Sequence, residues 1–426
     1  MKKYFLNTAS LILFTALGCS GAPSNGASSS TQSAISTPTL QHTDDLVPET
    51  FGGPLTLQIW LSEEFDPSSG TPAAGLLQAR LDQFAQSHPG LRITVRIKPL
   101  DGPSGILASL TAASAAAPLA LPDLVLLTRT HQEAAVSANL LVPIKDLLTL
   151  PEDNDWYPFA RQLSQVDNKF YGIPFAADVQ ILAYRPAVIG DHPTTWNAAL
   201  QTPGLLVFPA ADPQALSLLS LYQTFGGTLF DEAGNPSLDQ STLTALFTYF
   251  ETAQNTGLIP FWVTQYDSDE LAWQALRESR ASLGLTWMTR LLGNTTTDIA
   301  GAPLPTRSGQ SHHLATGWVW ALPNPQVSRH AISIELAEFL THSDFLAQWN
   351  AAAGYLPPRP SSLALWPANP LQALASQIVP NAQLVPSQPV IETLAAALSN
   401  AVIKVLKQEL SAADAAQFAI QELEQK

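Results

Sequence analysis

Leu55-Thr56-Leu57-Gln58-Ile59-Trp60-Leu61 alternates apolar with more polar side chains and predicts a β-strand. Helical spacing follows over Gly75–His88, alternation returns over Leu91–Ile97, and the Ala- and Leu-rich stretch Ile106–Ala117 predicts a second helix. Asp123–Leu127 is then an apolar run, as expected of a strand that is covered on both faces. Strands separated by helices predict an α/β fold with a mostly parallel sheet and with ligand sites at the carboxyl ends of the strands.

The N-terminus carries a targeting signal in residues 1–18. Two lysines precede the apolar run Leu11–Gly18, which is well short of the ~20 residues that a membrane-spanning helix needs, so the pattern predicts a signal peptide. Ala16–Cys19 resembles a bacterial lipobox, with Ala16 where that motif prefers Leu. The resemblance implies a lipid on Cys19 that anchors the protein at the extracytoplasmic face of a bacterial membrane. The alternative is an ordinary secretory signal in which the cysteine is incidental.

Composition limits what can follow the signal. Residues 19–50 are dominated by Ser, Gly, Ala, Thr, Pro and Gln, which predicts a flexible tether, and the rest of the chain suffices for about two domains of ~100 to 200 residues. The chain holds 35 acidic and 20 basic residues, so its formal charge of −15 argues against nucleic acid and acidic lipid surfaces as partners. Cys19 is the only cysteine, which excludes an internal disulfide.

Strand and helix patterns continue through the second half of the chain. Val166–Phe175 predicts a hairpin turn that leads into a strand continuing through Gln180–Tyr184. Leu238–Leu258 places its apolar residues on one helical face. Further helices are predicted over Ala331–Leu340 and, as an amphipathic pair, within Glu392–Lys426.

Five Gly-, Pro- and aromatic-rich segments follow one another in a recognisable order. They are Pro122–Val125 with Leu141–Ile144, Asn168–Pro174 with Leu182–Arg185, Pro193–Trp196, Phe225–Gly227 with Asp231–Pro236 and Gly257–Pro260, and Gly354–Arg359. Together they resemble the family 1 extracellular solute-binding proteins, the maltose-binding protein type that serves ABC importers. The chain departs from that pattern at Asn168, where the family has Gly, and at Arg185, where it has Asn.

The resemblance implies a two-lobed, periplasmic-binding-protein-like α/β fold, with a mostly parallel sheet flanked by helices in each lobe and a ligand cleft between the lobes. It places lobe 1 at residues 51–180 plus 297–341, and lobe 2 at residues 186–292 plus 345–426. It further implies a monomeric carrier in lipoprotein form that needs no cofactor or metal. Such a carrier captures a small solute by lobe closure and delivers it to the permease subunits of an ABC importer.

Aromatic side chains are the first candidates for the cleft, because sugar rings stack on them. Trp60 follows the first strand together with Glu63 and Glu64, and its alternative role is packing within its own lobe. Trp287 ends a stretch that resembles the family's "G-x-W" strand. Trp318 lies two residues from Trp320 and so on the same strand face, where we expect one ring to reach the cleft and the other to pack.

Three polar candidates complete the predicted site. Asp178 lies on the long crossing strand, where a carboxylate accepts sugar hydroxyls, and its alternative role is a salt bridge. Tyr355 and Arg359 border a Pro-Pro turn and are expected to approach the ligand from lobe 2. The alternative for Arg359 is a structural bond to the carbonyls of that turn.

The residues leave the solute and the class of protein open. A sugar or oligosaccharide is the first expectation, and polyols, polyamines, metals and phosphorylated solutes are alternatives within the same fold. The acidic excess favours a neutral or cationic solute. Glu63 and Glu64 also admit an extracellular carbohydrate-active hydrolase, although neighbouring residues on one loop seldom oppose each other across a glycosidic bond. A sensor or adhesin that has lost transport is a third possibility.

Overall fold

The computed structural model of the protein describes residues 55–148, 154–294, 298–307, 309 and 312–425. The predicted signal peptide 1–18, the lipid-bearing Cys19 and the tether 19–50 lie outside the described residues, and they stay predictions.

A nine-stranded sheet runs through two lobes in the order β2-β1-β3-β10-β6-β8-β7, with β11 beside β10 and β9 beside β6. The strands are β1 (Leu55–Ser62), β2 (Leu91–Lys98), β3 (Leu124–Thr128), β6 (Gly172–Tyr184), β7 (Leu206–Val207), β8 (Leu283–Trp287), β9 (Ala300–Ala302), β10 (Leu314–Ala321) and β11 (Gln383–Leu384). Strands β2, β1 and β3 pair in parallel, as do β7 and β8, whereas β10 and β6 pair antiparallel with their neighbours in the main path. The predicted two-lobed α/β fold is confirmed.

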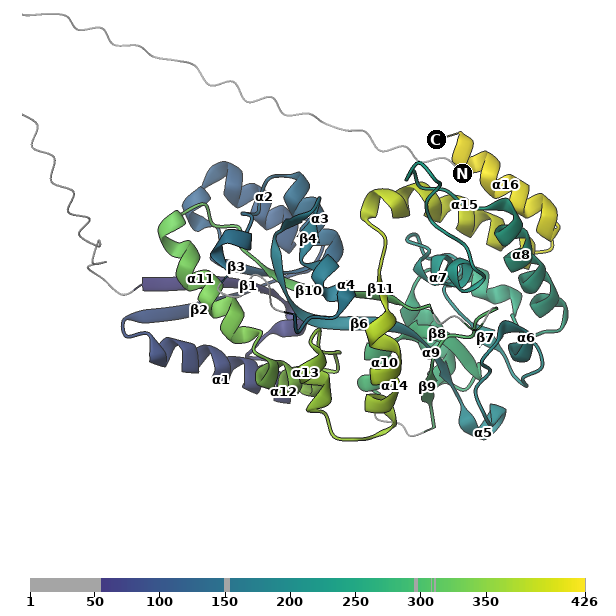
Figure 1. Cartoon of the computed structure of the whole chain (residues 1–426), viewed down its shortest axis with the longest axis horizontal. Coiled ribbons are helices and arrows are strands. Elements are labelled where there is room, and N and C mark those ends of the chain that lie inside the picture. The colour runs from purple at the N-terminus through teal and green to yellow at the C-terminus, as the bar shows by residue number, and fades with distance from the viewer. Residues whose placement is uncertain (1–54, 149–153, 295–297, 308, 310–311, 426) are drawn as a thin grey trace, which may run out of the picture. The chain divides into compact units, whose positions relative to one another are not determined.

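Strand β6 belongs to both lobes, as Figure 1 shows. Its first part, as far as Val179, pairs with β10 in the first lobe. From Gln180 onward the same strand pairs with β8 in the second lobe. The lobes are therefore joined through a shared hydrogen-bonded strand, and the described residues of both lobes belong to one compact unit.

A two-residue turn precedes β6, as the sequence predicts. Strands β4 (Gln165–Val166) and β5 (Lys169–Phe170) form a small antiparallel hairpin, and the turn residues Asp167 and Asn168 have φ angles of 49° and 60°. Asp and Asn adopt this left-handed conformation more readily than other residues with a side chain. Asn168 therefore satisfies the turn at the position where the resembling family has Gly.

The first lobe packs helices against both faces of its strands. Its helices are α1 (Pro72–Ser87), α2 (Ile106–Ala116), α3 (Arg129–Ser137), α11 (Val327–Leu340) and α12 (Ser343–Ala353). Leu57, Ile59 and Leu61 of β1 share a core with α1, α11 and α12. Val125 and Leu127 of β3 share the core on the other face with α2 and α3. The alternation along each strand decides which face a side chain enters.

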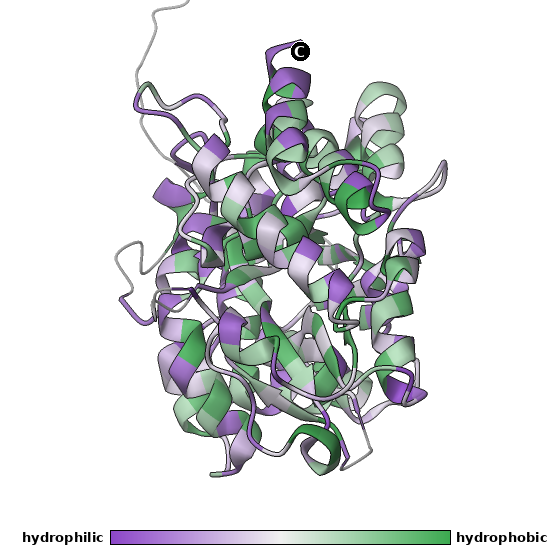
Figure 2. Cartoon of the chain, turned by 90° about the vertical axis from the view of Figure 1, so that its right-hand side faces the viewer, coloured by the Kyte–Doolittle hydropathy of each residue, from purple (hydrophilic) through white to green (hydrophobic). Residues whose placement is uncertain are grey.

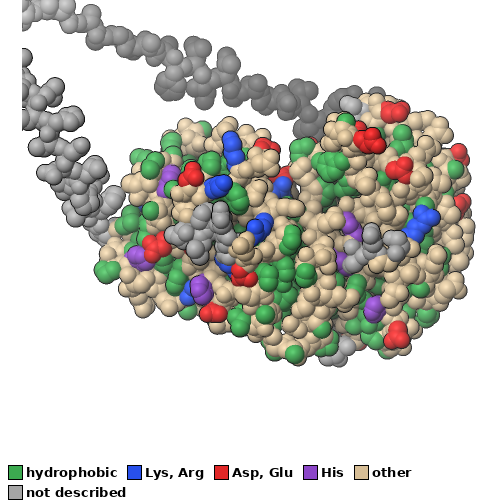
Figure 3. All heavy atoms as spheres, in the orientation of Figure 1, with side chains coloured by type: hydrophobic (Ala, Val, Ile, Leu, Met, Phe, Trp, Pro, Cys, Tyr) green, Lys and Arg blue, Asp and Glu red, His purple; other side chains and the backbone are tan. Residues whose placement is uncertain are grey.

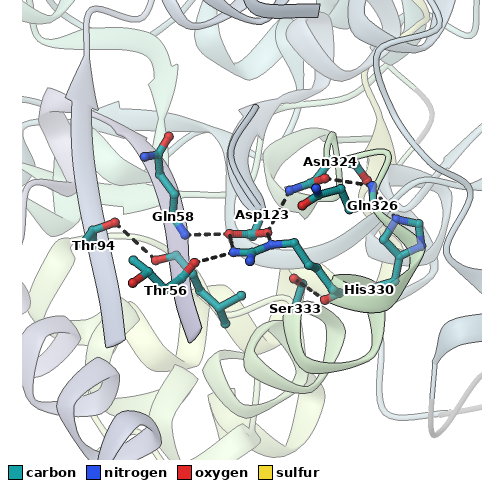
Figure 4. A network of polar contacts seen from close by, with 10 residues as sticks. Thr56, Gln58, Thr94, Asp123, Asn324, Gln326, His330 and Ser333 are labelled. Atoms are coloured by element: carbon teal, nitrogen blue, oxygen red, sulfur yellow. Dashed lines mark hydrogen bonds and ion pairs between the residues drawn. The ribbon is translucent and has the colours of Figure 1, made fainter. Parts of the chain in front are cut away.

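A buried ion pair connects β1, β3 and α11 in the first lobe (Figure 4). Asp123 is 2% exposed, and its carboxylate accepts bonds from the backbone N–H of Gln58 at 2.7 Å and from Nε of Arg329 at 2.5 Å. Asn324 donates a further bond to Asp123 at 3.0 Å. A buried carboxylate requires such partners, so the Pro122–Asp123 motif has a structural role at the start of β3.

The second lobe surrounds its strands with α5 (Pro186–Ile189), α6 (Trp196–Ala199), α7 (Leu216–Thr224), α8 (Gln240–Asn255), α9 (Asp269–Arg277), α10 (Met288–Leu292), α14 (Pro370–Ile378), α15 (Gln388–Leu406) and α16 (Ala412–Glu424). Figure 2 shows hydrophobic segments in the interior and hydrophilic ones toward the outside. Helix α15 is long and apolar enough to cross a membrane by length and composition, but 56% of its apolar window is buried, and its inner face packs in the core of this lobe.

Shorter elements complete the described chain. Helices α4 (Pro158–Leu163) and α13 (Pro360–Ala364) lie where the chain passes between the lobes. The 3₁₀ turns are η1 (Glu63–Phe65), η2 (Pro118–Ala120), η3 (Lys145–Leu147), η4 (Phe261–Gln265) and η5 (Val379–Asn381).

Two predicted lobe boundaries need correction. Residues 299–304, expected at the start of the returning part of lobe 1, pack in the second lobe, because β9 pairs with β6 beyond Gln180 and Ile299 and Leu304 join the core there. Phe345, Leu346 and Trp349 of α12, expected in lobe 2, pack in the first lobe, because they join the core around α1.

Candidate ligand-binding cleft

A cavity of about 580 Å³ lies between the two lobes and is lined by both. We call it the interlobe cleft, and its lining residues are Glu64, Thr128, Thr130, Asp178, Gln214, Leu216, Asp269, Trp287, Thr289, Arg290, Thr316, Ala353, Gly354 and Tyr355. A smaller cavity of about 180 Å³ adjoins it, shares Asp178 and Tyr355, and is also lined by Trp318. The larger volume falls within the range of small-molecule sites.

Strand ends position several of these side chains. Thr128 is the last residue of β3 and Trp287 the last of β8, so each stands at the carboxyl end of a strand that has a parallel neighbour. A helix begins directly after each strand, and the hydroxyl of Thr128 caps helix α3 by accepting from the backbone N–H of His131 at 3.3 Å. These are the positions where α/β sheets place their ligands.

Asp178 links the shared strand to the second lobe. Its Oδ1 accepts bonds from the backbone N–H groups of Val179 at 2.8 Å and Thr289 at 3.0 Å, and its Oδ2 accepts the hydroxyl of Thr289 at 2.5 Å. The side chain is 9% exposed and borders both cavities. Burial raises the pKa of Asp178 to about 7, against the lowering effect of the bonds from Thr289 and Val179, with a further increase from the charge of Asp269.

A second acidic group enters the cleft from helix α9. Asp269 accepts the hydroxyl of Thr286 at 2.8 Å and Nε of Arg290 at 2.8 Å. Burial raises the pKa of Asp269, and the bonds from Arg290 and Thr286 oppose that effect. Arg290 also forms an ion pair with Glu270. Arg290, the only basic side chain among the described residues that line the cleft, is thus engaged by two carboxylates.

Tyr355 forms an aromatic wall on the side of the first lobe. Its ring stacks on Phe65 with centroids 5.7 Å apart and on Trp349 with centroids 6.2 Å apart. Its hydroxyl donates to Oε2 of Glu64 at 3.2 Å. Burial raises the pKa of Tyr355, with the charge of Glu64 adding to it, so the phenol stays protonated and able to donate. The expectation that Tyr355 approaches from lobe 2 was wrong, because α12 holds it against the first lobe.

The structure brings five predicted residues to the two cavities and leaves three outside their linings. Glu64, Asp178, Trp287 and Tyr355 line the interlobe cleft, and Trp318 lines the adjoining cavity while its ring packs edge-on against Phe65. The residues outside are Trp60, Glu63 and Arg359.

Trp60 is a core residue. It is 3% exposed, packs with α2 and α3, and donates its indole N–H to Oε1 of Gln58 at 2.9 Å. The strand runs on to Ser62, so Trp60 lies inside the sheet and cannot reach its edge. Glu63 is exposed on the turn after β1, outside the linings of both cavities.

Arg359 makes structural contacts outside the cleft. Its guanidinium lies over the ring of Trp156 at 3.7 Å, and its Nε donates to the carbonyl of Thr341 at 2.9 Å. It also forms an ion pair with Asp155 at 3.5 Å. Arg359 thus has a structural role on a cavity separate from the cleft, although the carbonyl that accepts its bond belongs to Thr341 and lies outside the Pro-Pro turn.

Several cleft residues were not among those predicted from the sequence. Thr289 and Arg290 follow Trp287 by two and three residues in helix α10, so extending the prediction past the end of β8 would have included them. Asp269 and Gln214 come from the second lobe without any strand or motif signal. Within the described ranges, no group of three or more His, Cys, Asp or Glu side chains is placed to hold a metal ion.

Comparisons with known proteins agree with this architecture. A family model for bacterial extracellular solute-binding proteins matches residues 79–374. A maltotriose-binding protein of Pyrococcus abyssi is 26% identical over 137 residues, and the match spans 30% of this chain and only 30% of that relative's length.

Solved structures of binding proteins share the fold over most of the chain. A cyclic α-maltosyl-1,6-maltose binding protein from Arthrobacter globiformis superposes with a TM-score of 0.71 at 18% identity, covering 87% of this chain and 98% of that one. A maltotriose-binding protein of Thermus thermophilus, bound to maltotriose, gives a TM-score of 0.64 at 17% identity, covering 87% and 99%. These relatives are binding proteins and not enzymes. With its matching family model, two lobes and cleft, the chain belongs to the bacterial extracellular solute-binding proteins.

Proposed function

We propose that the protein captures a sugar or oligosaccharide outside the cytoplasm and delivers it to the permease of an ABC importer. The observation that carries this proposal is the interlobe cleft, where the rings of Trp287 and Tyr355 share a cavity with the carboxylates of Glu64, Asp178 and Asp269. Sugars offer apolar C–H faces that stack on such rings and hydroxyl groups that donate to such carboxylates. The named ligands of the relatives, maltotriose and cyclic maltosyl-maltose, support an α-glucoside as the first ligand to test.

Both lobes contribute residues that would contact the ligand. Glu64, Thr128 and Tyr355 contact the cavity from the first lobe, whereas Trp287 and Arg290 contact it from the second. A ligand that bridges both sets favours the closed arrangement by its difference in affinity between open and closed states. Closure also removes water from around the carboxylates and strengthens their hydrogen bonds. The permease then recognises the closed form.

The polar lining restricts the charge of the solute. Among the described residues that line the cavity there are three carboxylates and one guanidinium, that of Arg290, which is already paired with Asp269 and Glu270. An anionic solute would meet uncompensated negative charge there. Neutral sugars and polyols fit this lining, and a polyamine is the alternative solute because the carboxylates can pair with its ammonium groups.

We propose that the protein works as a lipoprotein anchored at Cys19. The lipobox-like sequence Ala16–Cys19 supports this, and the tether 19–50 would give the lobes freedom to meet the permease. Stable anchoring takes more than one acyl chain, which lipobox modification can provide.

A thermal-shift panel on the full chain tests the proposed solute class. Maltose, maltotriose, a mannotriose, sorbitol and spermidine are compared, and a true ligand raises the midpoint by mass action, increasingly so at higher ligand concentration. We expect the largest rise with an α-glucoside. A rise with spermidine alone would replace the sugar by a polyamine. Chromatography of the same incubations must recover the oligosaccharide intact, because product formation would instead support a hydrolase.

A further inference from the structure

A second cavity, of about 440 Å³, lies in the second lobe away from the interlobe cleft and shares no lining residue with it. We call it the α8 pocket. It is formed by one face of α8 and by residues that the motifs Pro193–Trp196 and Phe225–Gly227 contribute. Neither motif supplies a residue to the interlobe cleft.

Aromatic rings form one side of the α8 pocket. Trp196, Phe225 and Tyr249 all line it, with the Tyr249 ring centroid 5.6 Å from the centroids of both other rings. The indole N–H of Trp196 is used internally, because it donates to the hydroxyl of Thr224 at 2.8 Å. Tyr249 differs, since its hydroxyl has no hydrogen-bond partner among the described residues although Tyr249 is only 5% exposed. A buried hydroxyl without a partner is costly, so a bound group that accepts from it would remove that cost.

The other side of the pocket is a row of hydroxyl groups on α8. Thr244, Thr248 and Thr252 are spaced four apart and therefore stand on one face of the helix. Each hydroxyl donates its proton to the carbonyl four residues earlier, at 2.8, 2.7 and 2.8 Å respectively. Their oxygen atoms are left as acceptors, which suits a ligand that brings hydroxyl donors.

The charge of the α8 pocket indicates which charged group its ligand carries. Among the described residues that line the α8 pocket, Arg307 is the only charged one; it is exposed there, and it forms no ion pair with any residue that the structure describes. None of these described lining residues is Asp or Glu, in contrast to the three carboxylates of the interlobe cleft. On the face seen in Figure 3, charged side chains are scattered among neutral ones.

We propose that the α8 pocket is a second ligand site, which takes a small hydroxylated anion of the sugar-acid or sugar-phosphate kind. The anionic group pairs with Arg307, as guanidinium groups pair with carboxylate and phosphate. The ligand hydroxyls donate to the threonine oxygens, and Tyr249 donates its free hydroxyl to the ligand. This proposal goes beyond the proposed function and does not depend on it, because the two cavities share no residue and prefer opposite charges.

Titration calorimetry on the full chain tests the site with glucuronate and glucose 6-phosphate as probes and glucose as the neutral control. We expect one or both anions to bind, and glucose to bind at least about tenfold more weakly. Arg307→Gln and Tyr249→Phe should each weaken the anion by about tenfold, whereas Arg92→Gln, which removes an exposed positive charge elsewhere, should not. Tyr249→Phe keeps the ring and removes only a hydroxyl whose burial without a partner is costly, so the free protein should be at least as stable as before.

The cleft variant Trp287→Ala separates the two sites, because it should leave the anion affinity unchanged. The proposal is overturned if neither anion binds at concentrations up to about 10 mM. It is equally overturned if binding occurs but Arg307→Gln leaves it intact, or if Trp287→Ala abolishes it. The carboxylate and phosphate probes together show which anionic group the site prefers.

Discussion

Replacing Asp178 by Asn should change how the stability of the protein depends on pH. Asp178 is buried beside the cleft, and burial raises its pKa from 3.8 to about 7. A carboxyl whose pKa is higher in the folded than in the unfolded state stabilises the fold fully below pH ~4, and this contribution is lost as the pH rises through 7. Asn resembles the protonated carboxyl at every pH. Its oxygen can keep the bonds from Val179 and Thr289.

The size of the change in the free energy of unfolding follows from the change in the pKa of Asp178. A difference between 3.8 and about 7 corresponds to at most roughly 4 kcal/mol, because each pKa unit is worth about 1.4 kcal/mol. The free energy of unfolding of the wild type should therefore fall, relative to that of Asp178→Asn, by up to about 1.4 kcal/mol per pH unit between pH 4 and 7. Above pH 8 the variant should be the more stable of the two proteins.

Urea unfolding followed by tryptophan fluorescence at pH 4.5, 6 and 8 measures this difference directly. Asp344→Asn is the matched control, because Asp344 has a side chain 73% exposed and lines no part of the cleft. We expect the control and wild-type profiles to run parallel while the Asp178→Asn profile diverges upward. Parallel profiles for all three proteins would refute the argument, since they would mean that Asp178 is already ionised in the folded state at low pH.

Three further predictions concern other parts of the chain. Trp287→Ala should weaken sugar binding at least about tenfold, or ~1.4 kcal/mol, in calorimetry. The control variant Trp262→Ala changes a partly buried tryptophan outside the cleft and should keep the affinity. Unchanged affinity of Trp287→Ala with a large loss of stability would make Trp287 a core residue. Trp349→Ala should lower the free energy of unfolding by roughly 3–5 kcal/mol in urea, because the ring is 2% exposed, stacks on Phe65, and would leave a cavity when removed. A loss below about 1 kcal/mol would contradict that packing. Cys19→Ser should move the protein from the membrane fraction to the soluble fraction, and continued sedimentation with membranes would argue against lipidation.

The sequence predicts most strands and helices of the first lobe because their spacing is local. The strand predicted over Leu91–Ile97 and the helix over Ile106–Ala117 agree with β2 and α2 to within one residue at each end. The hairpin at Asp167 and Asn168 was also predictable, since few residues accept the left-handed conformation that its turn needs. Capping supports the helix predicted over Leu238–Leu258, where Asp239 accepts from the backbone N–H of Thr242 at 2.7 Å.

The lobe boundaries were harder to predict from the sequence because they depend on long-range packing. Helix α12 follows α11 in the chain and has no local feature that assigns it to either lobe. Its aromatic contacts place α12 in the first lobe, since the ring of Trp349 stacks on Phe65 with centroids 5.6 Å apart and lies 4.4 Å from the ring centroid of Phe175. Those contacts join residues far apart in the sequence, and spacing along one helix cannot reveal them.

The error at Trp60 has a physical cause. A side chain within β1 points to one face of the sheet, whereas residues at the carboxyl end of a parallel strand reach the edge where α/β folds bind ligands. Trp60 is two residues before the end of β1 and is buried, whereas Thr128 and Trp287 are the last residues of their strands and line the cleft. Trp60 lies within the strand Leu55–Leu61 that the sequence itself predicts, so expecting it beyond the end of that strand was wrong.

The shared strand β6 also determines how the protein can come apart. Each lobe uses a different stretch of this strand as a member of its own sheet, with Val179 and Gln180 on either side of the change of partner. A chain divided at that point would leave both halves with an incomplete sheet and an unpaired edge. The lobes should therefore unfold as one cooperative unit, and neither should be obtainable as an independently folding fragment. Backbone amides around this change of partner should be among the slowest in the molecule to exchange with solvent.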